Sequence, residues 1–205
     1  MKVFEKIIPF TIILTVSILL SACQHDSKPD NKTPAVISDN WQLIPKKSTL
    51  SFITTKNKVI SEEHTLKLSQ GQIHNLKFEA TIDLNTIDTQ IEIRDQRMRD
   101  ILFQTESFPQ ANISSQLPDN LSLNQTVTLP FILNLHGHQK TYNSQVLIQM
   151  VEDQLVVTNY DPVTVNAKDF DLDGAVNQLT KIAGLQGINY DVLVDFKLTF
   201  EKLMN

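Results

Sequence analysis

The chain has 205 residues, with 18 Lys and Arg against 23 Asp and Glu, so its formal net charge is −5 at pH 7. A mildly acidic chain without a basic cluster excludes a nucleic-acid partner, because phosphate contacts need Lys and Arg gathered on one face. The sequence holds only five glycines and one cysteine. It therefore has no glycine-rich phosphate loop and no internal disulfide.

The N-terminus has the pattern of a secretory signal. Lys2 and Lys6 form a positive segment, residues 7–20 are apolar, and residues 21–22 are small, as residues before a cleavage site are. As a helix, the apolar run would span roughly 21 Å at about 1.5 Å per residue, which is short of the roughly 30 Å hydrocarbon core. We therefore expect residues 1–22 to be a signal peptide and not a permanent transmembrane helix.

The segment that ends at the single cysteine, Leu20-Ser21-Ala22-Cys23, resembles the lipobox of bacterial lipoproteins. The resemblance implies that the Cys23 thiol receives a diacylglyceryl group, with acyl chains such as palmitate, and becomes the new N-terminus. Gln24 in the next position implies sorting to the outer membrane. We expect a lipoprotein anchored in the bacterial cell envelope and facing the periplasm, with the polar residues 23–40 as a flexible tether. The alternative is an ordinary secreted protein in which the cysteine is incidental.

Residues 41–205 have about the length of one domain and are sufficient to bury a core. Their dominant pattern has period two, which is typical of half-buried strands. Such alternation, or a short apolar run, predicts strands over residues 50–54, 76–84, 112–116, 127–135, 145–150, 155–159, 163–165 and 192–200. The segment His136-Gly137-His138-Gln139 separates two of these runs and predicts a hairpin turn, in which Gly137 can take a positive φ.

Two segments, residues 91–103 and 175–185, have helical spacing of their apolar residues instead. Successive antiparallel strands favour closure into a barrel, because closure removes the sheet edges. The polar positions include many Lys, Glu and Asp, which suit bulk water, so we expect the apolar side chains inside. The predicted fold class is all-β, an antiparallel eight-stranded barrel with two short helical excursions.

Several motifs resemble, in order and spacing, those of the YceI-like family of secreted bacterial proteins. Residue 171 is Asp where the family usually has Gly. The resemblance implies a lipocalin-like barrel over residues 41–205 that holds a polyisoprenoid, a prenyl quinone or another long amphipathic lipid. It implies a binding protein and not an enzyme, and no cofactor. The motifs are Trp41 to Pro45 with Ser48, Leu50 and Phe52; Ile82-Asp83-Leu84; Ile87-Asp88-Thr89; Arg94-Asp95 with Met98; Phe103 through Phe108-Pro109; Asn134 to Gly137; and Val165-Asn166-Ala167 with Asp169-Phe170.

The candidate ligand-binding residues are apolar residues on the predicted strands. An apolar chain that enters such a barrel gains about 25 cal/mol per Å² of buried surface, so affinity needs no polar contact. The alternative is a structural or interaction lipoprotein, whose barrel is filled by side chains and which binds a protein partner. The candidates are Phe52, Phe78, Ile82, Phe131, Leu133, Val146, Ile148, Val194 and Phe196.

Other chemistry has less support in the sequence. His136 and His138 would share one face of a strand, but no third metal ligand follows by spacing, so we expect no metal. Arg94, Arg97 and Asp100 are i, i+3 neighbours on the expected helix and favour a surface charge network. A contact between Arg94 or Arg97 and a polar ligand head at the barrel mouth stays open. Without a GxSxG elbow or a free thiol, we expect no catalytic residue.

Overall fold

A computed structural model describes residues 40–203 of the chain. The expected signal peptide, Cys23 and most of the tether lie outside these residues. The elements of the described part, in chain order, are β1 (Trp41–Leu43), the 3₁₀ turn η1 (Pro45–Lys47), β2 (Thr49–Lys56), β3 (Ile60–His74), β4 (Lys77–Asp88), α1 (Glu92–Arg97), the π-helical turn η2 (Met98–Phe103), β5 (Gln110–Gln116), β6 (Thr126–Leu135), β7 (His138–Val151), β8 (Gln154–Asn159), β9 (Val163–Asn166), the 3₁₀ turn η3 (Ala167–Phe170), α2 (Asp173–Ile182) and β10 (Asp191–Lys202).

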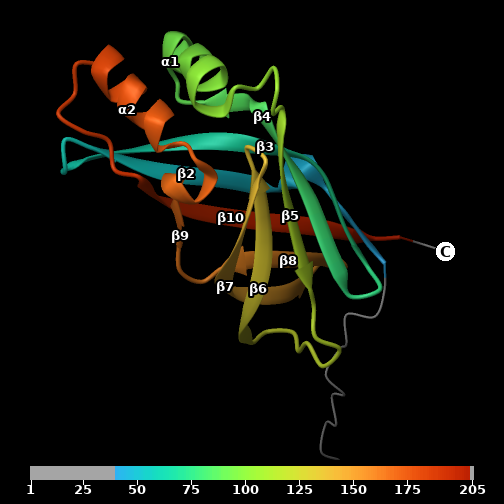
Figure 1. Ribbon diagram of the computed structural model, residues 1–205. Helices are drawn as coiled ribbons and strands as arrows, with labels where there is room; N and C mark the ends of the chain where they lie inside the picture. Colours follow the sequence, from blue (N-terminus) through green and yellow to red (C-terminus); the bar gives the residue numbers. More distant parts are fainter. Residues whose placement is uncertain (1–39, 204–205) are drawn as a thin grey trace, which may run out of the picture. The chain divides into compact units, whose positions relative to one another are not determined.

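Eight strands close into an antiparallel barrel (Figure 1). Going around the barrel, the order is β10, β2, β3, β4, β5, β6, β7 and β8, and β8 pairs with β10 to complete the ring. Neighbours are mostly consecutive in the chain, because short turns join antiparallel strands without crossovers. The predicted fold class, an eight-stranded antiparallel barrel with two short helices, is confirmed.

The last strand, β10, joins the two ends of the meander. One half of it pairs with β8, with Leu155 opposite Phe200, and the other half pairs with β9, with Val165 opposite Val192. On its other side β10 pairs with β2, and beyond the start of β2 it pairs with the short strand β1. The turn η1 separates β1 from β2 and begins with Pro45, which has no N–H to offer a sheet.

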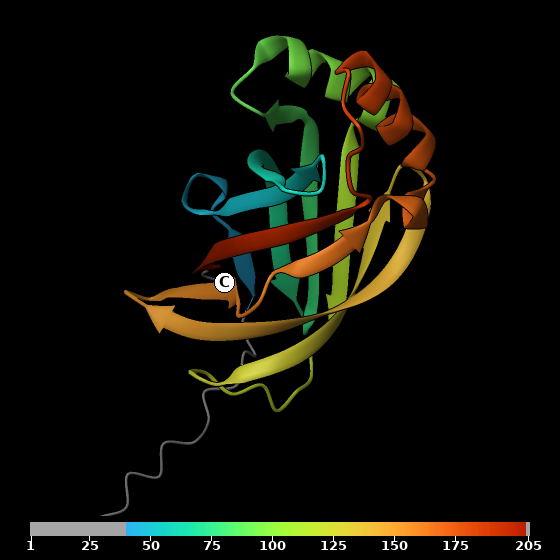
Figure 2. The same cartoon turned by 90° about the vertical axis from the view of Figure 1, so that its left-hand side faces the viewer.

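Both helical segments lie at one end of the barrel, next to each other (Figure 2). The first, α1 with η2, follows β4, and α2 leads through a loop into β10. The helices predicted over residues 91–103 and 175–185 are therefore confirmed, with α2 beginning two residues earlier. The opposite end holds β1 and the end of β10, where Trp41 pairs with Lys202. Within residues 40–203, no helix has the length and apolar character needed to cross a bilayer.

The sequence did not predict β3, although β3 is the longest strand of the barrel. Its register against β4 shifts between Thr65 and Lys67 and again between Leu68 and Gln70, so a simple period of two is broken. Its first half also carries a polar residue, His64, on the inner face of the sheet. The eight strands that close the barrel therefore differ from the eight predicted, because β3 belongs to the ring while the predicted strand 163–165 (β9) only extends the pairing of β10.

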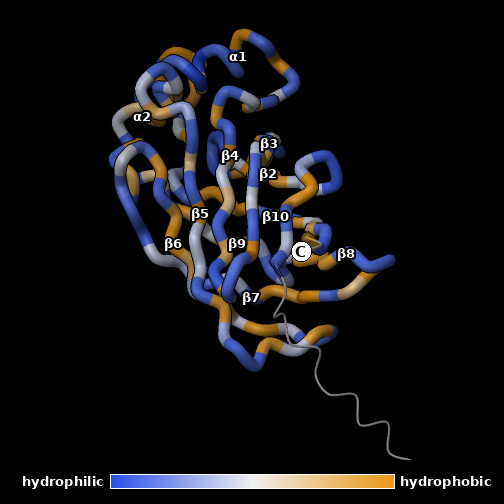
Figure 3. The backbone as a smooth tube through the Cα atoms, turned by 90° about the vertical axis from the view of Figure 1, so that its right-hand side faces the viewer, coloured by the Kyte–Doolittle hydropathy of each residue, from blue (hydrophilic) through white to orange (hydrophobic). Residues whose placement is uncertain are grey.

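The apolar side chains face the interior, as expected from the charged residues at the other positions. Hydrophilic and hydrophobic residues alternate along the strands (Figure 3). Phe170, Phe200 and Leu155 have at most 1% of their surface exposed. Burial of a side chain of this size contributes about 1.5–3 kcal/mol to folding. The interior-facing rows of the strands thus both stabilise the barrel and form the walls of the space inside it.

Candidate functional site

The barrel encloses a cavity of about 580 Å³. Its walls are side chains from β2 to β10, and α1, η2 and α2 contribute side chains at the helical end. Most of them are aliphatic or aromatic. Cavities that hold small molecules have volumes of roughly 300–1,000 Å³ and mostly apolar linings. Side chains therefore do not fill the interior. The alternative of a structural or interaction protein assumed a filled barrel, and the cavity does not agree with that assumption.

The nine candidate ligand-binding residues all line this cavity. The alternation of apolar and polar residues along the strands was sufficient to identify them, because each of the nine lies on the inner face of its strand. Their contact with a ligand stays a prediction. The list did not include the lining residues of β3, which was not predicted, or those of the helical segments. The nine are Phe52, Phe78, Ile82, Phe131, Leu133, Val146, Ile148, Val194 and Phe196; among those missed are Leu66, Leu68, Met98, Phe103, Val176 and Leu179.

Polar side chains gather at the helical end of the cavity. His64, on β3, is 2% exposed, and its Nε2 lies 3.0 Å from Thr54 Oγ1 on the neighbouring strand β2. The His64 ring also contacts Phe52 edge to face, with 5.3 Å between ring centroids. Burial, and then the positive charge of Arg94, lower the pKa of His64 below its ordinary value of 6.5. The ring is therefore neutral at pH 7.

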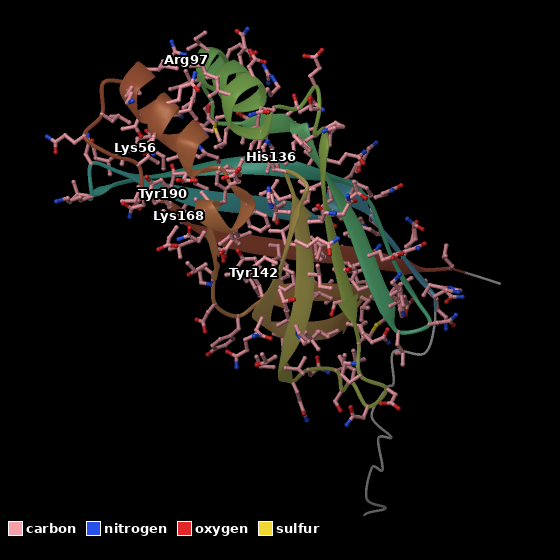
Figure 4. The ribbon with its side chains drawn as sticks, viewed as in Figure 1. Lys56, Arg97, His136, Tyr142, Lys168 and Tyr190 are labelled. Atoms are coloured by element: carbon pink, nitrogen blue, oxygen red, sulfur yellow. The ribbon has the colours of Figure 1, made fainter. Side chains whose placement is uncertain are left out.

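A network of three charged side chains lies beside His64. Glu62, on β3, accepts hydrogen bonds from Lys56 Nζ and, at 2.6 Å, from an Arg94 guanidinium nitrogen. The hydrogen bond from Lys56 and the charge of Arg94 hold the pKa of Glu62 below its ordinary value. Arg94 also donates to the carbonyl oxygen of Thr89 at 2.6 Å. These contacts fasten α1 to the rim of the barrel. Figure 4 labels Lys56 and Arg97 in this region.

The expectation of a surface charge network around Arg94 is wrong. Arg94 pairs with Glu62 of β3 instead of a neighbour on its own helix, because the start of α1 lies against the barrel mouth. Arg97 lines the cavity and is partly buried. Among the described residues, the Arg97 side chain has no hydrogen-bond or ion-pair partner. Both Arg94 and Arg97 line the cavity, as a contact with a polar ligand head at the barrel mouth would require.

The segment with two histidines is the predicted hairpin turn between β6 and β7. His136 and Gly137 both take positive φ, +52° and +79°, as a two-residue turn of this kind requires. His136 packs on Phe108, with ring centroids 4.2 Å apart, and its position in the turn separates it from the strand on which His138 lies. The same-face argument for a metal site therefore does not apply. Residues 40–203 contain no group of three or more His, Cys, Asp or Glu placed to hold a metal ion.

The sequence profile of the YceI-like domain matches residues 41–200. The chain belongs to the YceI-like family. The match covers all strands of the barrel except the last two residues of β10, and the resemblance of the sequence motifs to this family is confirmed.

Two solved structures show what this YceI-like chain is similar to. A domain from Saccharophagus degradans, described as a polyisoprenoid binding domain implicated in plant cell wall breakdown, is 28% identical, with a TM-score of 0.74 over 80% of this chain and 98% of that chain. BcnA from Burkholderia cenocepacia is 15% identical, with a TM-score of 0.58 over 77% of this chain and 98% of that chain. The second likeness shows the fold alone. Among proteins with curated descriptions, none matches this YceI-like chain.

One side of the YceI-like barrel is held together by side chains. The first half of β7 has no ladder partner beyond β6, and η3 lies against it instead. Tyr142 on β7 donates its hydroxyl to Asp169 of η3 at 2.8 Å, and Lys140 lies 3.1 Å from the same carboxylate. Burial and the bond to Asp169 raise the pKa of Tyr142, and that bond lowers the pKa of Asp169. Two charge-assisted contacts therefore hold η3, whose Phe170 lines the cavity, against β7.

Proposed function

We propose that the protein binds a polyisoprenoid or a similar long amphipathic lipid inside its barrel, as a binding protein and not as an enzyme. The observation that carries the proposal is the apolar cavity of about 580 Å³ inside a YceI-like barrel. The polyisoprenoid binding domain from Saccharophagus degradans supports it, because that domain is 28% identical and shares the fold over most of this chain.

The apolar wall is sufficient to account for affinity. Each buried CH₂ group of a ligand contributes about 0.8 kcal/mol, and the loss of translational and rotational freedom opposes binding by about 4–15 kcal/mol. A short chain therefore does not bind measurably, and a chain of several isoprene units does. Aromatic side chains in the wall, such as Phe52 and Phe131, add polarizable contact surface for the branched chain.

The dependence of affinity on chain length tests the proposal. A solvatochromic apolar dye bound in the cavity is displaced by prenyl alcohols of increasing length, from geraniol to farnesol to geranylgeraniol. All three have the same hydroxyl head, so only the buried apolar surface changes. We expect affinity to rise at least tenfold with each added isoprene unit until the cavity is full. Displacement that is absent, or that is equal for all three alcohols, would contradict lipid binding in the barrel.

We further propose that the protein is a lipoprotein of the bacterial cell envelope, anchored through acyl chains on Cys23 and facing the periplasm from the outer membrane. The support is the segment Leu20 to Cys23 and the Gln24 that follows it. Cys23→Ala should leave an unprocessed precursor without added acyl mass, and Ser21→Ala, which keeps a small residue before the cysteine, should be processed normally. Intact mass and membrane fractionation measure both. An unchanged mass of the Cys23→Ala chain relative to processed wild type would refute the anchor.

A further inference from the structure

The helical end of the cavity carries more positive than negative charge. Lys56, Arg94 and Arg97 line the cavity there. Glu62 is bonded to the first two of these cations, and the buried Asp95 accepts hydrogen bonds from the backbone N–H and the hydroxyl of Thr89. Three cations thus lie beside two carboxylates, each of which accepts two hydrogen bonds through one of its oxygens. The rest of the cavity wall is apolar apart from the His64 imidazole and a few hydroxyl, amide and phenol groups.

Two guanidinium groups at this end have donors without partners. The Arg97 side chain forms no hydrogen bond and no ion pair with any described residue. Arg94 uses its terminal nitrogens on Glu62 and on the Thr89 carbonyl, but its Nε is buried and unpartnered within residues 40–203. A buried donor without a partner costs about 1–3 kcal/mol. The buried Nε of Arg94 therefore needs an explanation, and an acceptor that arrives with a ligand would supply one.

His64 gives independent support from a deeper level of the cavity. It is 2% exposed, lines the cavity, and has one ring nitrogen bonded to Thr54. Its other nitrogen, Nδ1, is buried and has no partner within residues 40–203. A neutral imidazole can donate or accept there, depending on its tautomer. An unpartnered polar atom in an otherwise apolar wall marks the place where the polar part of a ligand would meet the protein.

We infer that the cavity selects a lipid with an acidic head, a phosphate or carboxylate, whose oxygens are bound by Arg97 and by the free donor of Arg94. The inference rests on the proposed function, because it assumes that the apolar part of the cavity takes the chain. The planar fork of a guanidinium group matches an oxyanion with two parallel hydrogen bonds, and these are stronger than bonds to a neutral oxygen. A neutral alcohol or quinone of equal chain length leaves the surplus charge without a counterion.

The test compares two lipids that share one chain and differ in the head. Geranylgeranyl monophosphate and geranylgeraniol are titrated against the full chain, released from cells in a mild detergent and measured by native mass spectrometry. The variants are Arg97→Gln, the conservative Arg97→Lys, and Arg99→Gln as a matched control. Arg99 follows closely in the chain, but it bonds to Glu92 and does not line the cavity.

In the wild type we expect the phosphate to bind at least tenfold more tightly than the alcohol. Arg97→Gln should remove most of that preference, because the phosphate loses a charged partner. Arg97→Lys should keep part of the preference, and Arg99→Gln should keep all of it. Equal affinity for the two lipids in the wild type, or equal losses for Arg97→Gln and Arg99→Gln, would overturn the inference while the proposed function stands. If neither lipid binds, the proposed function fails and the inference falls with it.

Discussion

Ser144 provides a direct perturbation of the cavity. It lies on β7, lines the cavity and is 4% exposed, and its hydroxyl oxygen is buried without a hydrogen-bond partner among the described residues. Leu at this position would extend into space that the cavity provides. Ser144→Leu should therefore stabilise the unliganded protein and weaken lipid binding, because the same volume cannot hold both side chain and ligand.

The magnitude follows from two contributions. Removal of an unpartnered buried hydroxyl contributes about 1–3 kcal/mol, and burial of a Leu side chain contributes about 1.5–3 kcal/mol. Partial contact on the cavity side and local adjustment reduce the sum, so we expect a gain of about 2 kcal/mol in the free energy of unfolding. For a domain of this size, that gain corresponds to an increase of roughly 4–8 °C in Tm.

The matched control is Ala80→Leu on β4. Ala80 is also 4% exposed, but it does not line the cavity, and it packs against Gly71 of the neighbouring strand. Added volume there has no space to occupy and should cost about 1–3 kcal/mol. Urea unfolding measures both variants, and dye displacement by geranylgeraniol measures binding. If Ser144→Leu destabilises the protein as much as Ala80→Leu does, the interior is packed at Ser144 and the reasoning is refuted.

Two further predictions concern stability. Because burial lowers the pKa of His64, the unfolded chain takes up a proton at higher pH than the folded chain, and stability falls as the pH drops below about 6.5. His64→Gln should flatten the pH dependence of the unfolding free energy between pH 6.5 and 5 by up to about 1.4 kcal/mol per pH unit. An unchanged slope, measured by urea unfolding at several pH values, would argue against a buried neutral His64. At Gly71, a methyl group would lie 3.1 Å from Leu43 Cβ and 3.3 Å from Ala80 Cβ. Gly71→Ala should therefore lower the unfolding free energy by about 1 kcal/mol. Steric strain of about 1–3 kcal/mol outweighs the gain of about 0.4–1 kcal/mol from the lower entropy of the unfolded chain. A measured increase in the unfolding free energy would show instead that β1 moves aside freely.

The sequence predicted the parts of the fold that depend on local pattern. Alternation along β4, β6 and β10 identified inner and outer faces, and so six of the nine candidate residues that line the cavity; the other three lie on β2 and β7. It did not predict β3, because two register shifts break the alternation and His64 is a polar residue on the inner face. Register shifts depend on the pairing of strands that are distant in the chain, which no single segment encodes.

The polar end of the site was harder to predict for a related reason. Helical spacing placed Arg94 and Arg97 beside Asp100, but the contact that forms is between Arg94 and Glu62, residues 32 positions apart. Arg94 reaches Glu62 because α1 packs against the barrel mouth. Helical spacing in the sequence predicts only which residues are neighbours on the same helix. The cavity itself was equally beyond the sequence, since an inner row of apolar residues is compatible with a filled barrel or a hollow one.

The most direct test of the central claim identifies what the protein holds when cells produce it. The full chain is released into a mild detergent, analysed by native mass spectrometry, and then extracted with organic solvent so that any lipid can be identified. We expect a stoichiometric added mass that matches a lipid with a long prenyl chain. A chain that carries no lipid, and still carries none after incubation with prenyl phosphates and prenyl quinones, would contradict it.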